Sequence, residues 1–161
     1  MRGHAMDQNN LMERAAALAL QKMRANQGGP FGAVIVRGGE VIAEGWNQVT
    51  SANDPTGHAE VTAIRNACAK LETFSLEGCD IYTNCEPCPM CLGAIYWARI
   101  QRIYYSNTRS DAAKIGFDDD FIYREIGIPL AERSIPSIRV ANATAELAFS
   151  EWAAKPDKRR Y

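Results

Sequence analysis

The 161-residue sequence lacks the features of membrane proteins and of most nucleic-acid-binding proteins. It contains no uninterrupted stretch of about 20 apolar residues, the length that a membrane-spanning helix requires. Its N-terminus has no apolar segment of the kind found in secretory signal peptides. Its 18 Lys and Arg residues are balanced by 19 Asp and Glu residues, so the net charge of −1 gives no general attraction to phosphate backbones. We therefore expect a cytoplasmic protein that acts on a small molecule, without a membrane or nucleic acid as partner.

The sequence also lacks linkers, internal repeats and a disulfide framework. No run rich in Gly, Ser and Pro divides the chain, so residues 1–161 are predicted to form a single domain with a charged tail at 155–161. The cysteines number five, which is odd, and Cys85, Cys88 and Cys91 lie within seven positions. This spacing fits a metal site in a reducing compartment better than it fits paired disulfides.

Hydrophobic periodicity and turn residues predict helices that alternate with strands after an initial hairpin. Gly38 and Gly39 mark the hairpin turn, because glycine tolerates the positive φ values of tight turns. The alternation predicts an α/β fold of three layers (αβα), with a mixed five-stranded sheet covered by helices on both faces. The predicted helices cover residues 10–24, 58–71, 88–98, 110–114, 119–126 and 144–154, and the predicted strands cover residues 31–36, 41–46, 79–83, 100–106 and 137–140.

His58, Cys88 and Cys91 form a candidate zinc site at the starts of two predicted helices. Catalytic zinc sites use three protein ligands and keep one position for water, and one imidazole with two thiolates is a known ligand set. Cysteines three positions apart share a helix face, and the positive end of the helix dipole favours their thiolate form. Because sites in α/β folds form where loops and helix N-termini converge, we expect the two segments to meet and bind Zn²⁺.

Glu60, two residues after His58, is the candidate general acid and base. Bound zinc makes hydroxide available near neutral pH, and a neighbouring carboxylate can take a proton from water and pass it to a departing amine. The combination of His-x-Glu and Pro-Cys-x-x-Cys is the signature of zinc-dependent deaminases. The alternative is a closed structural zinc site with Cys85 as fourth ligand. Two features argue against it: Pro87 is expected to turn Cys85 away from the metal, and a closed site would leave Glu60 without a role.

Four segments resemble the bacterial guanine deaminases of the cytidine deaminase-like superfamily, and the resemblance covers nearly the whole chain. The first three segments are shared in weaker form by tRNA adenosine deaminases and other nucleobase deaminases. The fourth segment and the terminal Tyr161 are the features that point to guanine. The segments are GGPFGAVIV at 28–36, NDPTGHAEVTAIR at 53–65, CEPCPMCLGAIYWAR at 85–99 and GFDDDFIY at 116–123.

The resemblance implies a hydrolase of purine catabolism that converts guanine to xanthine and ammonia. It implies that Asn47 hydrogen-bonds the purine, that Ala59 offers a backbone N–H, and that Phe31 and Trp97 contact the ring. It also implies that Asp119 assists recognition or proton transfer, which suits guanine because a carboxylate only accepts hydrogen bonds from the N–H donors of its edge. By residue type alone, Asn47 also fits a turn, Phe31 and Trp97 also fit a core, and three adjacent acids also fit a solvated loop.

The resemblance further implies a homodimer in which the C-terminal segment is swapped between subunits. In that arrangement Tyr161 closes the active site of the partner subunit. By composition alone, the tail at 155–161 also fits a mobile basic terminus.

Two alternative functions stay open at this point. The first is a tRNA adenosine deaminase or another nucleobase or amino-triazine deaminase, although Lys158, Arg159 and Arg160 are a small basic cluster for anchoring RNA. The second is a zinc-stabilised scaffold without catalytic activity.

Overall fold

The computed structural model describes residues 7–161, and the chain forms two compact units. The first unit ends at Tyr123 and the second begins at Arg124. No helix in the described part of the chain is long and apolar enough to cross a membrane.

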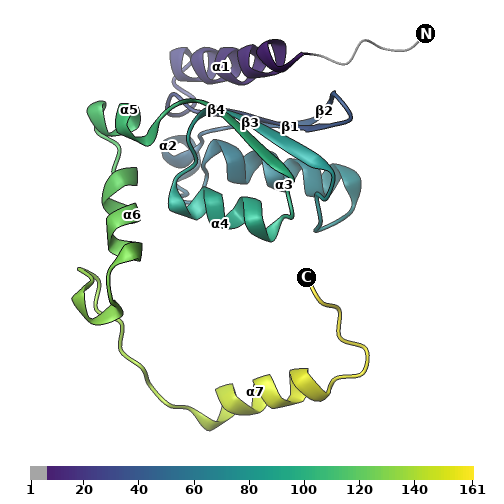
Figure 1. The fold of residues 1–161 in the computed structure, drawn as a ribbon, viewed down its shortest axis with the longest axis vertical. Coiled ribbons are helices and arrows are strands. Elements are labelled where there is room, and N and C mark those ends of the chain that lie inside the picture. The colour runs from purple at the N-terminus through teal and green to yellow at the C-terminus, as the bar shows by residue number, and fades with distance from the viewer. Residues whose placement is uncertain (1–6) are drawn as a thin grey trace. The chain divides into compact units, whose positions relative to one another are not determined.

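A four-stranded mixed sheet forms the centre of the first unit (Figure 1). Its strand order is β2-β1-β3-β4, in which β1 pairs antiparallel with both β2 and β3, while β4 is parallel to β3. The predicted hairpin is confirmed, because Gly38 and Gly39 join β1 to β2 with φ angles of 59° and 84°. The strands are β1 (Gly32–Arg37), β2 (Glu40–Trp46), β3 (Cys79–Cys85) and β4 (Arg102–Asn107).

Helices cover both faces of this sheet, as the sequence predicts (Figure 1). On one face, Leu11 and Ala15 of α1 pack with Val34 and Tyr82. On the other face, α3 and α4 enclose a second buried cluster around Ala63. The helices of this part of the chain are α1 (Gln8–Arg24), α2 (Val49–Ala52), α3 (Ala59–Leu71), α4 (Pro89–Trp97), α5 (Arg109–Lys114) and α6 (Asp119–Gly127), the last of which continues into the second unit.

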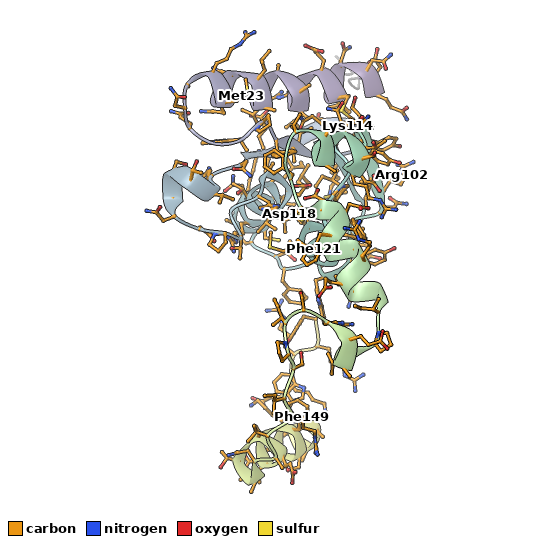
Figure 2. The ribbon with its side chains drawn as sticks, turned by 90° about the vertical axis from the view of Figure 1, so that its left-hand side faces the viewer. Met23, Arg102, Lys114, Asp118, Phe121 and Phe149 are labelled. Carbon is orange, nitrogen blue, oxygen red and sulfur yellow. The ribbon has the colours of Figure 1, made fainter. Side chains whose placement is uncertain are left out.

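The predicted fifth strand is wrong for the described chain. The segment expected to form it, residues 137–140, adopts neither helix nor strand. A strand needs a neighbour to pair its peptide groups, and residues 124–161 of the second unit contain no other strand. This unit instead holds the 3-10 helix η1 (Leu130–Glu132) and the helix α7 (Ala143–Ala154), on which Phe149 is exposed (Figure 2).

Small residues bring α3 close to the sheet. Its buried face carries Ala59, Ala63 and Ala67, and Gly45 of β2 lies opposite. A Cβ atom at Gly45 would lie 2.4 Å from the carbonyl oxygen of Ala59 and 2.4 Å from the amide nitrogen of Ala63. No side chain fits such a gap, so Gly45 sets the distance between the start of α3 and the sheet.

We expect Gly45→Ala to destabilise the protein by about 1–3 kcal/mol, because the added methyl group must push α3 away from β2. The free energy of unfolding from urea denaturation measures this change. Gly127→Ala, at the last residue of α6, is the matched control, since an added Cβ there meets no atom within 4 Å. Equal stability of the two variants would contradict the close packing of α3 on β2.

Candidate metal centre and active site

The three predicted metal ligands lie at the N-termini of α3 and α4. His58 is the N-cap residue of α3 and Cys88 is the N-cap residue of α4. Pro89 follows at the first helical position of α4, where its missing N–H costs no intrahelical hydrogen bond. Cys91 lies one turn further, and its backbone nitrogen is 3.5 Å from the Sγ atom of Cys88. The positive ends of both helix dipoles therefore favour thiolates at this point.

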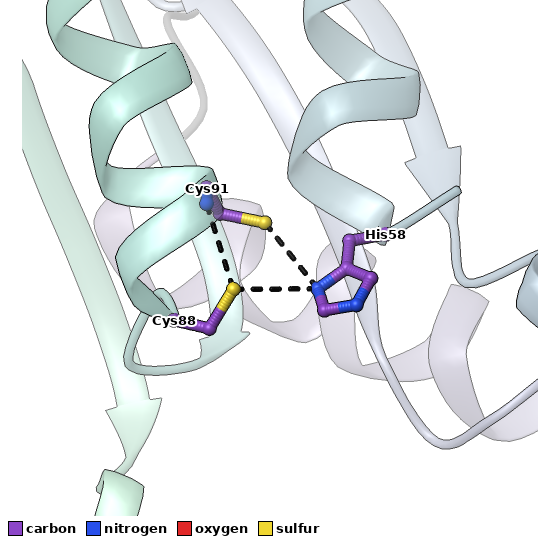
Figure 3. Close-up of side chains that lie close together, drawn as sticks. All are labelled: His58, Cys88 and Cys91. Atoms are coloured by element: carbon purple, nitrogen blue, oxygen red, sulfur yellow. Dashed lines mark hydrogen bonds between the residues drawn. The ribbon is translucent and has the colours of Figure 1, made fainter. Parts of the chain in front are cut away.

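Figure 3 shows the imidazole of His58 facing both cysteine sulfurs. Its Nδ1 atom is 3.4 Å from the Sγ atom of Cys88 and 3.5 Å from the Sγ atom of Cys91. Around a tetrahedral zinc ion with Zn–N of about 2.0 Å and Zn–S of about 2.3 Å, a nitrogen and a sulfur ligand are about 3.5 Å apart. The spacing of the three predicted ligands therefore fits a zinc ion.

The closed four-ligand site considered from the sequence is not formed. Among residues 7–161, no further His, Cys, Asp or Glu side chain joins the group of His58, Cys88 and Cys91. The Sγ atom of Cys85 donates instead to the carbonyl oxygen of Thr108 at 3.7 Å, and burial raises the pKa of this thiol to about 12. Three protein ligands with a neighbouring acid are typical of catalytic zinc sites rather than structural ones.

The two candidate cysteine ligands differ in their affinity for protons. Hydrogen bonds from Cys91 and His58 lower the pKa of the Cys88 thiol to about 4. The contact with Cys88, together with burial, raises the pKa of Cys91. The hydrogen bond with Cys88 also raises the pKa of His58. Of the two cysteines, Cys88 therefore gives up its proton more readily, and its thiolate form favours a cation at this point.

Glu60 lies on the face of α3 that packs against the sheet. It shares this face with Ala63 and Ala67, and only 6% of its surface is exposed. Its Oε2 atom accepts a hydrogen bond from the Sγ atom of Cys91 at 3.3 Å. Burial raises the pKa of the carboxyl group to about 7, the range in which a group both accepts and donates protons near neutral pH.

A cavity of about 320 Å³ opens beside the predicted metal ligands, and His58, Glu60 and Cys88 are among the residues that line it. Its volume lies in the range of pockets that bind small molecules. Phe31 and Asn47, two of the residues that the resemblance assigned to substrate, also line the cavity. The geometry thus combines a metal site, a buried acid and a pocket for a small ligand.

Asp119 is the one member of the acidic triplet Asp118 to Asp120 that lines this cavity. It lies in the first turn of α6, and burial raises the pKa of its carboxyl group. The sequence alone did not distinguish the three acids, because helical phase decides which of them faces inward.

Asn47 is held by the backbone on both sides of the cavity rim. Its Oδ1 atom accepts hydrogen bonds from the amide of Gly29 at 3.2 Å and from the amide of Val49 at 3.3 Å. The side chain is 7% exposed, and a Cβ atom at Gly28 would lie 1.6 Å from the carbonyl oxygen of Asn47. With the oxygen fixed in this way, the amide NH₂ group is the part that can donate to a ligand.

The remaining predicted substrate residues do not line the cavity. Ala59 is fully buried as the first residue of α3, where a backbone N–H has no acceptor within the helix. Trp97 is the last residue of α4 and is 64% exposed. Tyr161 lies in the second unit. The contacts predicted for Trp97 and Tyr161 with substrate stay predictions.

Sequence reasoning did not assign Phe117, Glu86 and Pro55 to the cavity wall. The ring of Phe117 meets the ring of Phe31 edge to face, with 4.7 Å between their centroids. These residues come from loops, and their residue types carry no periodic signal. Only the position of Phe117 in the family-like segment at 116–123 could have drawn attention to it.

Comparison with known proteins decides the family of this chain. Residues 6–107 match the family described as the cytidine and deoxycytidylate deaminase zinc-binding region. The chain belongs to this deaminase family. All three ligands of the predicted zinc site lie within the matched residues.

Two relatives show how far the similarity of this deaminase extends. It is 51% identical over 156 residues to the guanine deaminase of Bacillus subtilis (strain 168), a match that covers 97% of this chain and 100% of the relative. The X-ray structure of guanine deaminase from Bacillus subtilis superposes with a TM-score of 0.93, covering 97% of this chain and 99% of that chain. The tRNA-specific adenosine deaminase of Aquifex aeolicus (strain VF5) is 47% identical over 77 residues, which are 48% of this chain and 51% of the relative.

We expect Cys88→Ser to leave the purified deaminase with less than about half of the zinc bound by the wild type, because a thiolate is lost from a three-ligand site. Metal analysis of the purified proteins measures this content. Cys85→Ser is the matched control, because Cys85 lies outside the ligand group and should leave zinc binding intact. Equal zinc loss in both variants would show that the ligand set is wrong.

Proposed function

We propose that this protein is a zinc-dependent guanine deaminase, which hydrolyses guanine to xanthine and ammonia. The observation that carries the proposal is a buried carboxyl group beside the zinc ligands, at the wall of a cavity of about 320 Å³. The 51% identity to a guanine deaminase along the whole chain supports guanine as the substrate.

Glu60 would move the protons of the reaction. A bound zinc ion would supply a water molecule activated as a nucleophile. Glu60 would accept a proton from that water and deliver it to the exocyclic nitrogen that leaves as ammonia. A pKa of about 7 suits both half-steps, because the same group must accept and then donate a proton at neutral pH.

The cavity wall offers groups that match the chemistry of guanine. The carboxylate of Asp119 would accept from the N–H donors of the purine edge, and the NH₂ group of Asn47 would donate to an acceptor of the ring. The backbone N–H of Ala59 would be a further donor, since this residue follows His58 at the start of α3 although it is not among the residues that line the cavity. Phe31 and Phe117 would contact the ring with apolar surface.

Amino-triazines are alternative small substrates of the same site. Deamination of adenosine in tRNA is the second candidate activity. The tRNA-specific adenosine deaminase of Aquifex aeolicus (strain VF5) supports this second activity over only 48% of this chain. A net charge of −1 argues against it, since RNA binding draws on excess positive charge. Guanine is therefore the better-supported substrate.

Ammonia release by the zinc-loaded protein tests this function directly. We expect the rate with guanine to exceed the rates with adenine, cytosine, cytidine, guanosine, amino-triazines and a tRNA anticodon stem-loop by about a hundredfold, because the polar groups of the cavity are matched to one base edge. Turnover of the stem-loop without turnover of guanine would favour the tRNA alternative. Glu60→Gln should lower the rate by about 10²- to 10⁴-fold with zinc retained, whereas a silent scaffold would show no turnover in either protein.

We also propose that residues 1–161 form one deaminase domain that is completed in a homodimer, with the C-terminal segment swapped between subunits. Residues of the second unit expose apolar side chains without burying them in a core of their own, including Ile138 (85% exposed), Val140 (81%) and Phe149 (83%). In the first unit, β4 is an edge strand, to which a partner segment could add. The predicted contact of Trp97 with substrate would likewise require a second subunit, because this residue does not line the cavity of its own chain.

In this dimer Tyr161 would cover the cavity of the partner and shield the bound substrate from bulk solvent. We expect deletion of Tyr161 alone to reduce guanine turnover by at least about tenfold, with zinc content and melting temperature unchanged. Light scattering should show a dimer for both proteins. Unchanged turnover of the deletion variant, or a monomeric wild type, would contradict the swapped arrangement.

A further inference from the structure

Tyr123 connects the helix that carries Asp119 to the loop that carries Cys88. It follows Asp119 by four positions on α6, so both side chains lie on the same side of the helix. Its hydroxyl group donates a hydrogen bond of 2.8 Å to the carbonyl oxygen of Pro87, the residue before Cys88. One side chain therefore joins two elements of the site.

Arg109 contacts the same tyrosine, and Glu86 in turn contacts Arg109. The guanidinium of Arg109 lies over the ring of Tyr123, 4.6 Å from its centroid. The backbone N–H of Arg109 donates to the Oε2 atom of Glu86 at 2.9 Å. Because Glu86 and Pro87 are adjacent in sequence, these contacts link the four residues in a closed cycle. Tyr123 is therefore held by two contacts, a hydrogen bond and a cation–π interaction, rather than by one.

Asp119 depends on α6 for its place at the cavity wall, because it lies in the first turn of this helix, one turn before Tyr123. Burial raises the pKa of its carboxyl group. Desolvation of the charged form favours movement toward solvent, which a fixed helix opposes.

We propose that Tyr123 is a positioning residue, which holds Asp119 at the wall of the active-site cavity through its hydrogen bond to Pro87 and its contact with Arg109. The tyrosine itself does not line the cavity. It acts through Asp119, and its effect on turnover rests on the guanine deaminase function proposed above. This role differs from those of the metal ligands and Glu60, because Tyr123 keeps an acid of α6 beside them.

The variant Tyr123→Phe tests the proposal, because it removes the hydroxyl group and keeps the ring over which Arg109 lies. We expect kcat/KM for guanine to fall about five- to tenfold, the effect of one lost hydrogen bond on an active-site geometry, with zinc content unchanged. Tyr104→Phe is the matched control. Tyr104 stacks on Tyr82 on the α1 side of the sheet, away from the cavity, so its variant should keep full activity.

A double-mutant cycle separates positioning from general stabilisation. If Tyr123 acts through Asp119, adding Tyr123→Phe to Asp119→Asn should lower kcat/KM by less than about twofold further, while the fall in melting temperature is the same in both backgrounds. A full five- to tenfold loss in the Asp119→Asn background, or wild-type activity of Tyr123→Phe, would overturn the proposal.

Hydrogen exchange gives a second measurement that does not depend on the substrate. In zinc-loaded Tyr123→Phe, amides of residues 119–127 should exchange faster than in the wild type, while those of residues 59–71 should be unchanged. If the wild type fails to deaminate guanine, the proposed function is wrong, but the exchange comparison still decides whether Tyr123 restrains α6. Unchanged exchange at 119–127 would overturn the proposal whatever the substrate.

Discussion

The active site depends on the meeting of two helix N-termini. His58 lies at the start of α3, and Cys88 and Cys91 lie at the start of α4. Both cysteine sulfurs are within 3.5 Å of the Nδ1 atom of His58. This contact is possible because the small residues Gly45 and Ala63 let α3 lie close to the sheet. Both helix dipoles then point their positive ends at the sulfurs, and the resulting thiolate charge attracts a metal ion.

The same packing buries Glu60, and burial of a carboxylate is energetically unfavourable. Helical spacing puts this acid on the stripe of Ala63 and Ala67, so it faces the core rather than solvent. Burial destabilises the charged form and raises the pKa of the carboxyl group to about 7, which suits the proton transfer proposed for it at neutral pH. Ala at this position would suit the core better, which supports the functional role proposed for this acid.

Much of the fold and site could be predicted from the sequence because the deciding signals are local. The spacing of His58, Cys88 and Cys91 identified the ligands, and the glycine pair at 38–39 identified the hairpin. The wall residues Phe117 and Glu86 could not be derived in this way, because they come from loops whose positions depend on tertiary packing. The fifth strand at 137–140 was wrong because β propensity describes a segment and not the neighbour with which it must pair. Contacts such as the one between Tyr123 and Pro87 link residues 36 positions apart and leave no pattern in the sequence.

X-ray absorption spectroscopy of the zinc-loaded protein tests the central claim most directly, because it counts and identifies the atoms bound to the metal. Two helix N-termini that supply one imidazole and two thiolates predict two sulfur atoms at about 2.3 Å and two lighter atoms at about 2.0–2.1 Å, one of them not from the protein. A shell of three sulfur atoms would bring Cys85 into the site and make it a closed structural centre. That result would contradict both the geometry and the function proposed for this protein.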